Sequence, residues 1–135
     1  PISEYILPKP INSYGQTKYL GEEACLEYNP NSIIIRTSWL YSQFGDNFVK
    51  KIINQMINRR EVSAISDNCG SPTNAEDLAN LICRIVYSQK WYPGVYNFSN
   101  KGSTTWFNFA MEIISYLNIK CNVIPIKSKE FNFFS

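Results

Sequence analysis

The chain has 135 residues, of which 44% are hydrophobic and 18% charged, a balance typical of a globular protein with a core of its own. Thirteen basic and eleven acidic residues leave a net charge of +2. These charges are spread evenly, so we predict binding neither to nucleic acid nor to a membrane. There is no histidine, which excludes Ser-His-Asp hydrolysis, cysteine-histidine nucleophiles and histidine-bearing metal sites within this chain.

The four cysteines are far apart and form no Cys-x-x-Cys pair, so the sequence predicts no metal site and no disulfide framework. We expect reduced, mostly buried thiols in a cytoplasmic protein. No apolar run approaches the roughly 18 residues that cross a membrane, and no signal peptide is visible. The absence of an initiator methionine at Pro1, and an apolar tail at 131–135 that no further element follows, predict a piece of a longer protein.

A helix is the first predicted element, from Ser13 to about Tyr28. Prolines hold the preceding residues in an extended loop, and the turn at 29–31 ends the helix. Ser13, followed three residues later by Gln16, is typical of a capping box. We therefore expect Ser13 to cap the helix and to begin it.

Tyr14 and Lys18 lie four residues apart at the start of this helix, so they share one face. A phenol, whose ordinary pKa is about 10, becomes a usable proton donor near neutral pH when a cation lies beside it. The same spacing recurs at 5–9, in the proline-rich loop, and at 116–120, where a lysine complements the end of a helix. Spacing alone leaves open a half-buried tyrosine beside a solvated lysine.

The run from Ser32 to Thr37 is rich in β-branched residues and predicts a strand buried on both faces of a parallel sheet. Ser38 and Trp39 follow at its carboxyl end, where ligands of open α/β sheets bind. We expect its sheet neighbours to come from upstream. An unpaired edge on such a strand invites pairing with another chain, so we also expect a homodimer or self-association through this edge.

Asp46 is expected to cap a second helix that continues to about Arg60, with an apolar stripe in the core. That stripe is formed by Phe48, Ile52, Ile53, Met56 and Ile57. Asn74 is the expected cap of a third helix. The remaining predicted elements, in chain order, are a strand at 62–65, a turn-rich segment at 67–73, the third helix at 74–88, a strand at 95–98, a helix at 105–117 and a strand at 121–126.

Strands that alternate with helices predict an α/β fold. Only one strand is expected to be buried on both faces, so a parallel sheet is begun within this chain and not completed.

Five blocks, in order, resemble the carboxyl-terminal part of the dTDP-4-dehydrorhamnose reductase family within the extended short-chain dehydrogenase/reductases. They are 10–22 (PINSYGQTKYLGE), 35–41 (IRTSWLY), 46–49 (DNFV), 70–79 (GSPTNAEDLA) and 94–110 (GVYNFSNKGSTTWFNFA). Five ordered blocks are far more specific than one Tyr-x-x-x-Lys match. The resemblance implies that residues 1–39 are a partial Rossmann-like unit, the remnant of a nucleotide-binding domain, with the Tyr-x-x-x-Lys helix and one buried parallel strand. It implies that residues 40–135 form a small α/β substrate-binding domain, which binds the sugar nucleotide.

The resemblance implies a reductase that transfers hydride from NADPH or NADH to the C4 ketone of dTDP-4-dehydro-6-deoxy-L-mannose. The product, dTDP-L-rhamnose, would supply surface polysaccharide. Tyr14 would donate the proton, and Tyr14 and Lys18 would both contact the cofactor. Thr37 and Ser38 would line the nicotinamide pocket, and Trp39 would contact the sugar nucleotide. A core role stays open for Trp39, and packing is favoured for Trp106.

None of the six glycines forms the glycine-rich dinucleotide turn of that family, which lies amino-terminal to the matched blocks. The serine or threonine that completes the family's catalytic trio lies there too. We therefore expect this chain alone to be inactive. Two alternatives stay open: a related sugar-nucleotide epimerase or dehydratase, and a non-catalytic, reductase-like regulatory subunit.

Overall fold

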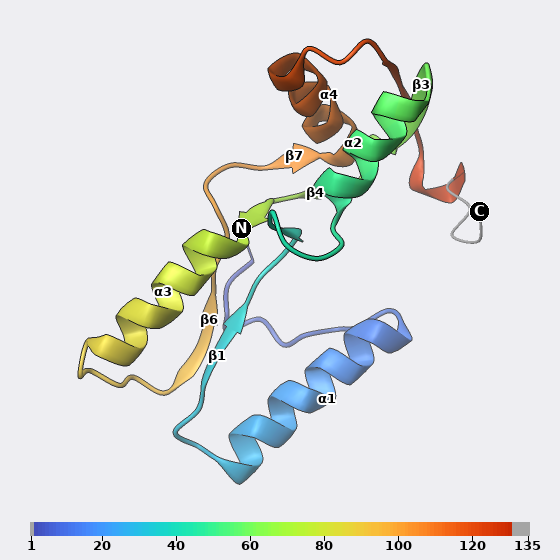
Figure 1. The fold of residues 1–135 in the computed structure, drawn as a ribbon. Helices are drawn as coiled ribbons and strands as arrows, with labels where there is room; N and C mark the ends of the chain where they lie inside the picture. The colour runs from blue at the N-terminus through green and yellow to red at the C-terminus, as the bar shows by residue number, and fades with distance from the viewer. Residues whose placement is uncertain (1, 131–135) are drawn as a thin grey trace. The chain divides into compact units, whose positions relative to one another are not determined.

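The computed structural model describes residues 2–130, and the chain divides into two compact units (Figure 1). The first unit comprises Pro1–Thr37 and Leu78–Phe98, and the second comprises Ser38–Asp77 and Ser99–Ser135. The break after Thr37 lies close to the expected boundary between residues 39 and 40. However, the first unit also contains Leu78–Phe98, which the sequence placed in the substrate-binding part. The functional division at residue 39 stays a prediction.

Helix α1 (Ser13–Tyr28) opens the first unit, with the bounds that the sequence predicted. Its cap is Asn12, not Ser13: the Asn12 side chain accepts a hydrogen bond from the Gly15 N–H at 2.8 Å. Asn12 has extended backbone angles (φ −146°, ψ 168°), as an N-cap requires, whereas Ser13 is already helical. The predicted capping box is therefore wrong, because the residue before it caps the helix.

Strand β1 (Ile33–Arg36) pairs in parallel with β6 (Gly94–Asn97), in the register Ile33↔Gly94 to Arg36↔Asn97. This partner lies downstream in the chain, and the expectation of sheet neighbours from upstream stays a prediction. All four residues of β1 are only partly buried. The prediction of a strand buried on both faces is wrong within residues 2–130, because one face, with Ile33 and Ile35, lines an open groove. There β6 is the only strand that pairs with β1.

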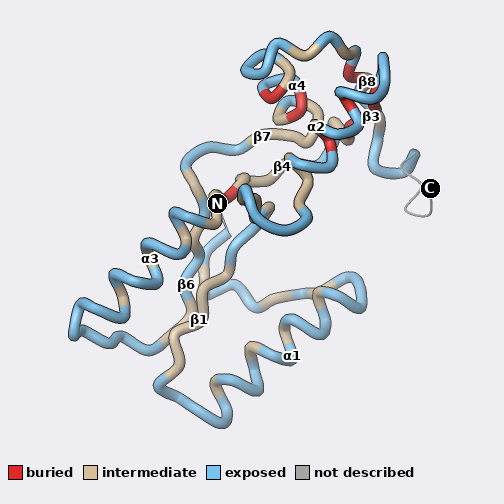
Figure 2. The backbone as a smooth tube through the Cα atoms, viewed as in Figure 1, coloured by how far each residue is buried: buried red, intermediate tan, exposed pale blue. Residues whose placement is uncertain are grey.

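The second unit contains the buried apolar residues of the described part of the chain, and Figure 2 colours the backbone of buried residues red. Strands β3 (Glu61–Ile65) and β8 (Asn122–Ile126) pair in parallel, and helices α2 (Phe48–Asn58) and α4 (Trp106–Leu117) pack on them. Alternation along β3 turns Val62 and Ala64 inward and exposes Glu61 and Ser63. The buried core is Ile52, Met56, Val62, Ala64, Ala110, Ile113 and Val123.

Helix α2 differs from its prediction at two positions. Asn47, not Asp46, is the cap, and its side chain accepts a hydrogen bond from the Lys50 N–H at 3.2 Å. Ile57, placed in the apolar stripe by the sequence, is 67% exposed, because it lies beyond the side of α2 that packs on the sheet. The expectation of mostly buried thiols is also wrong: three of the four cysteines are exposed.

Four strands of two residues each were not predicted. Strand β2 (Leu40–Tyr41) pairs in parallel with β5 (Thr73–Asn74), and β4 (Cys69–Gly70) pairs antiparallel with β7 (Thr104–Thr105). The remaining elements are helix α3 (Ala75–Tyr87) and the 3₁₀ turn η1 (Ser128–Glu130). The α/β class is confirmed. No helix between residues 2 and 130 is long and apolar enough to cross a membrane.

Candidate functional site

Tyr14 and Lys18 lie on one face of α1, as their spacing predicted. Lys18 Nζ is 5.5 Å from the centroid of the Tyr14 ring. Both residues are exposed, Tyr14 to 72%. Within residues 2–130 neither the Tyr14 hydroxyl nor the Lys18 ammonium group takes part in a hydrogen bond or an ion pair. Both groups are therefore free to meet a ligand.

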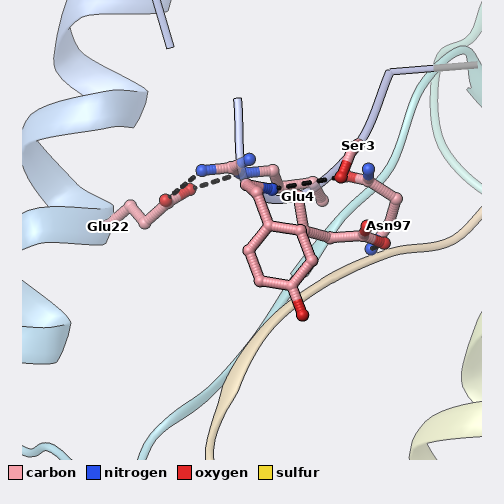
Figure 3. Close-up of polar contacts among 6 residues, drawn as sticks. Ser3, Glu4, Glu22 and Asn97 are labelled. Carbon is pink, nitrogen blue, oxygen red and sulfur yellow. Dashed lines mark hydrogen bonds and ion pairs between the residues drawn. The ribbon is translucent and has the colours of Figure 1, made fainter. Parts of the chain in front are cut away.

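One ion pair joins α1 to β1. Arg36 on β1 donates to both carboxylate oxygens of Glu22 on α1, and the bond to Oε2 measures 2.9 Å (Figure 3). Glu22 thereby raises the pKa of the Arg36 guanidinium above its ordinary value. Two parallel, partly buried charge-assisted bonds fix the rotation of α1 against the strand. The face that carries Tyr14 and Lys18 is held by this contact.

The loop before α1 is attached to β6. The Asn97 N–H donates to Glu4 Oε1 at 2.9 Å, between two residues labelled in Figure 3, and the Asn97 side chain donates to the Ile2 carbonyl. The first of these bonds lowers the pKa of the Glu4 carboxyl below its ordinary value. The approach to α1 is therefore tied to the strand that pairs with β1.

Thr37 and Ser38 follow β1 in the chain but fall in different units. Thr37 is exposed at the end of the first unit. Ser38 belongs to the second unit, where its hydroxyl donates to the Ser71 carbonyl at 2.8 Å. The Ser38 hydroxyl is thus left with acceptor capacity only.

Trp39 has an unusual backbone. Its φ is +47°, in the left-handed region, where a bulky side chain costs about 1–3 kcal/mol. The Trp39 carbonyl accepts a hydrogen bond from the Thr73 N–H at 3.1 Å, and Leu40 then pairs with Thr73 in β5. Thr73 is fully buried. These contacts within the second unit hold Trp39 in its strained conformation.

The indole of Trp39 stacks on that of Trp106, the first residue of α4. The ring centroids are 3.5 Å apart and the planes differ by 11°, so Trp106 covers one face of Trp39 almost completely. Phe48 leans on the Trp106 ring, with centroids 4.3 Å apart. Packing was the role favoured for Trp106 on sequence, and this contact agrees with it.

Gly70 lies against Trp39 as well. A β-carbon on Gly70 would come closest to Trp39 Cε2 and would lie 2.7 Å from both Nε1 and Cζ2. Cε2 is bonded to those two atoms and recessed between them, so an approach from the edge would meet them first. The approach is therefore over the ring face, and only glycine permits it. The sequence did not predict the contact between Gly70 and Trp39, although the block 70–79 that contains Gly70 was identified.

The structure brings Tyr14 and Lys18 together in the first unit, and Ser38 and Trp39 with Ser71, Gly70 and Trp106 in the second. The pairing of Cys69 with Thr105 in the β4–β7 ladder places Gly70 and Trp106 near each other. Each group is defined within its own unit.

A family model described as "RmlD substrate binding domain" matches residues 1–133. The chain belongs to this family. The dTDP-4-dehydrorhamnose reductase of Escherichia coli is 38% identical over 104 residues, which are 75% of this chain and 35% of that protein. The spore coat polysaccharide biosynthesis protein SpsK of Bacillus subtilis is 36% identical over 124 residues, which are 92% of this chain and 42% of that protein.

Solved structures give the same family. The dTDP-4-dehydrorhamnose reductase of Bacillus anthracis, in complex with NADP, superposes with a TM-score of 0.90 at 44% identity, over 95% of this chain and 45% of that one. Its counterpart from Clostridium acetobutylicum has a TM-score of 0.91 at 35% identity, over 98% and 46%. The chain spans less than half the length of these relatives of the RmlD substrate binding domain family.

Proposed function

We propose that this chain is the substrate-binding part of an NAD(P)H-dependent reductase of dTDP-4-dehydro-6-deoxy-L-mannose, in the synthesis of dTDP-L-rhamnose. The observation that carries the proposal is the Tyr14–Lys18 pair, exposed on one face of α1 in a chain of the RmlD substrate binding domain family. The names of the relatives from Escherichia coli and Bacillus anthracis support the substrate. The NADP in the second of these supports the cofactor.

The chemistry divides between cofactor and chain. A bound nicotinamide cofactor supplies the hydride that reduces the ketone carbon. The Tyr14 hydroxyl gives its proton to the ketone oxygen, and an alcohol results. The Lys18 cation stabilises the phenolate left on Tyr14 and offers donors to the ribose of the cofactor. The absence of competing partners for both groups among residues 2–130 fits this use.

Thr37 and Ser38 are proposed to border the nicotinamide, and Trp39 the sugar nucleotide. Thr37 has an exposed hydroxyl, whereas the Ser38 hydroxyl, which donates to Ser71, can only accept a further bond. The backbone strain at Trp39 supports a role beyond packing, since strained residues gather at ligand sites.

The reductase reading is favoured over an epimerase or a dehydratase. The UDP-glucuronic acid 4-epimerase of Bacillus cereus and the dTDP-glucose 4,6-dehydratase of Bacillus anthracis are 23% and 16% identical, at TM-scores of 0.79 and 0.78. At these identities they share the fold alone. The reductases of Bacillus anthracis and Clostridium acetobutylicum are 44% and 35% identical. No contact in residues 2–130 favours a purely regulatory subunit.

Binding tests the proposal directly. In isothermal calorimetry, the chain should bind dTDP-L-rhamnose saturably, and Trp39→Ala should bind it more weakly. Trp91→Phe, altered in the first unit, is the control and should bind as the wild type does. Because the glycine-rich turn is absent, the chain alone should not oxidise NADPH in the presence of substrate. A folded chain that does not bind dTDP-L-rhamnose, or one that turns over NADPH by itself, would contradict the proposal.

Self-association is a second proposed property. Within residues 2–130 β1 pairs only with β6, so its other edge keeps unpaired N–H and C=O groups. Ile33, Ile35 and Ile85 also line an open, mostly apolar groove of about 540 Å³ in the first unit. We expect light scattering to show a mass that rises above the monomer with concentration, and Ile35→Lys, which places a charge in this groove, to reduce that rise. A wild-type chain that stays monomeric at high concentration would argue against association through this edge.

A further inference from the structure

Trp39 is held between two groups of the second unit. Trp106 lies on one face of its indole, at a centroid distance of 3.5 Å, and Gly70 lies over a ring face at Cε2. Two parallel rings at this distance leave no space for a backbone between them. Gly70 therefore lies on the face opposite Trp106. We call Gly70, Trp39 and Trp106 the Trp39 stack.

The stack leaves only the edge of the indole open. Trp39 is partly exposed, and both of its faces are covered, so the exposed surface includes the ring edge. Within residues 2–130 Trp39 Nε1 donates to no acceptor. It is also not a buried orphan: the one buried side-chain polar atom without a partner in that range is Thr73 Oγ1. The Nε1–H donor of Trp39 thus reaches solvent unpaired.

Backbone strain is the second, independent observation. The φ of +47° at Trp39 is maintained by the bond from the Thr73 N–H to the Trp39 carbonyl and by the β2–β5 pairing that follows. An indole placed only for packing needs neither a strained backbone nor a free donor. Strain of this kind persists where the surroundings fix a group for use.

We infer that Gly70 and Trp106 are positioning residues, which hold Trp39 so that it meets the dTDP-sugar with its edge and donates Nε1–H to an oxygen of the ligand. A nucleotide base cannot stack on Trp39, because both ring faces are taken. This inference rests on the proposed function, since it assigns the mode of contact within that site. It makes glycine at position 70 a requirement for binding.

Fluorine NMR of the chain labelled with 5-fluorotryptophan tests the positioning without a ligand. Three signals are expected, from Trp39, Trp91 and Trp106. Trp91 lies in the first unit, where its Nε1 donates to the Asn31 carbonyl, and serves as the internal reference. Gly70→Ala should move the signals of Trp39 and Trp106 and leave that of Trp91 unchanged. Gly21→Ala, where a methyl group meets nothing within 4 Å, should move none of them.

Calorimetric titration with dTDP-L-rhamnose tests the use of the edge. Gly70→Ala should lower the affinity about tenfold, and so should Trp39→Phe, which keeps a ring but lacks the N–H. Gly21→Ala should bind as the wild type does. Trp106→Phe, which keeps a flat ring, should retain most of the affinity that Trp106→Leu loses. If Gly70 and Trp106 served only to stabilise the fold, the loss of affinity in each variant would instead parallel its loss of thermal stability.

Each outcome of the fluorine NMR and the titration either supports or overturns the inference. Wild-type affinity in Gly70→Ala, in Trp106→Leu or in Trp39→Phe would overturn the inference. If Gly70→Ala fails to fold, the comparison of Trp106→Phe with Trp106→Leu decides. If the wild type does not bind dTDP-L-rhamnose, the proposed function and the edge contact fail. Unmoved Trp39 and Trp106 signals in Gly70→Ala would overturn the positioning alone.

Discussion

Replacing Tyr14 with phenylalanine should lower ketone reduction by about 10²- to 10⁴-fold, the usual contribution of a positioned general acid. The rate is measured in a chimera in which this chain replaces the matched part of the Bacillus anthracis reductase, which supplies the NADP-binding remainder. NADPH oxidation with dTDP-4-dehydro-6-deoxy-L-mannose is followed by absorbance. The loss should appear mainly in kcat, because Tyr14→Phe removes a proton donor and keeps the ring.

Tyr116→Phe is the matched control. Tyr116 is followed by Lys120 with the same spacing as Tyr14 and Lys18, and it is 87% exposed at the end of α4. Its substitution should leave the rate unchanged. Equal rates in Tyr14→Phe and the unaltered chimera would show that the spacing at Tyr14 carries no catalytic role.

Truncating Met56 to alanine should lower the free energy of unfolding by about 2–5 kcal/mol. Met56 on α2 is 1% exposed and belongs to the cluster with Val62 and Val123 of the β3–β8 sheet. Alanine leaves a cavity that a packed core cannot close. Denaturant unfolding followed by far-UV circular dichroism gives the difference.

The second methionine of the chain provides the control. Met111 on α4 is 44% exposed, so Met111→Ala should cost less than about 1 kcal/mol. Met56→Leu conserves volume and should cost less than about 1.5 kcal/mol. Similar losses for Met56→Ala and Met111→Ala would place the core elsewhere.

Local signals predicted the helices well and their caps poorly. Tyr28 ends α1 as expected because the Asn-Pro-Asn turn follows it. Both cap errors are shifts of one residue, from Ser13 to Asn12 and from Asp46 to Asn47. In each case two adjacent residues have side chains that can cap a helix. Only the backbone angles decide between them, and those depend on how the preceding loop is tied down.

Pairing between distant segments could not be predicted. The partner of β1 is β6, which lies beyond α2 and α3 in the chain, at Gly94–Asn97, and nothing in the isoleucine run specifies it. The two-residue strands β2, β4, β5 and β7 are too short for a periodic pattern. The exposure of single side chains could not be predicted either, because it depends on the same packing between distant segments. Ile57 matches the apolar stripe of α2, but the β3–β8 sheet covers only part of that stripe.

The candidate site likewise has a part that the sequence could predict and a part that it could not. Tyr14 and Lys18 share a helix, so their proximity follows from the helical repeat alone. Trp39, Gly70 and Trp106 lie in three separate sequence blocks, and only the β2–β5 and β4–β7 ladders bring them together. The sequence identified the blocks, but it could not show that Gly70 and Trp106 cover the two faces of one indole.

The stoichiometry of the reaction tests the central claim most directly. In the chimera, one NADPH should be oxidised for each dTDP-L-rhamnose formed from dTDP-4-dehydro-6-deoxy-L-mannose. Conversion of a sugar nucleotide without net oxidation of NADPH would indicate an epimerase or a dehydratase. A folded chimera that binds dTDP-L-rhamnose but oxidises no NADPH would contradict the account and indicate a subunit that binds without catalysis.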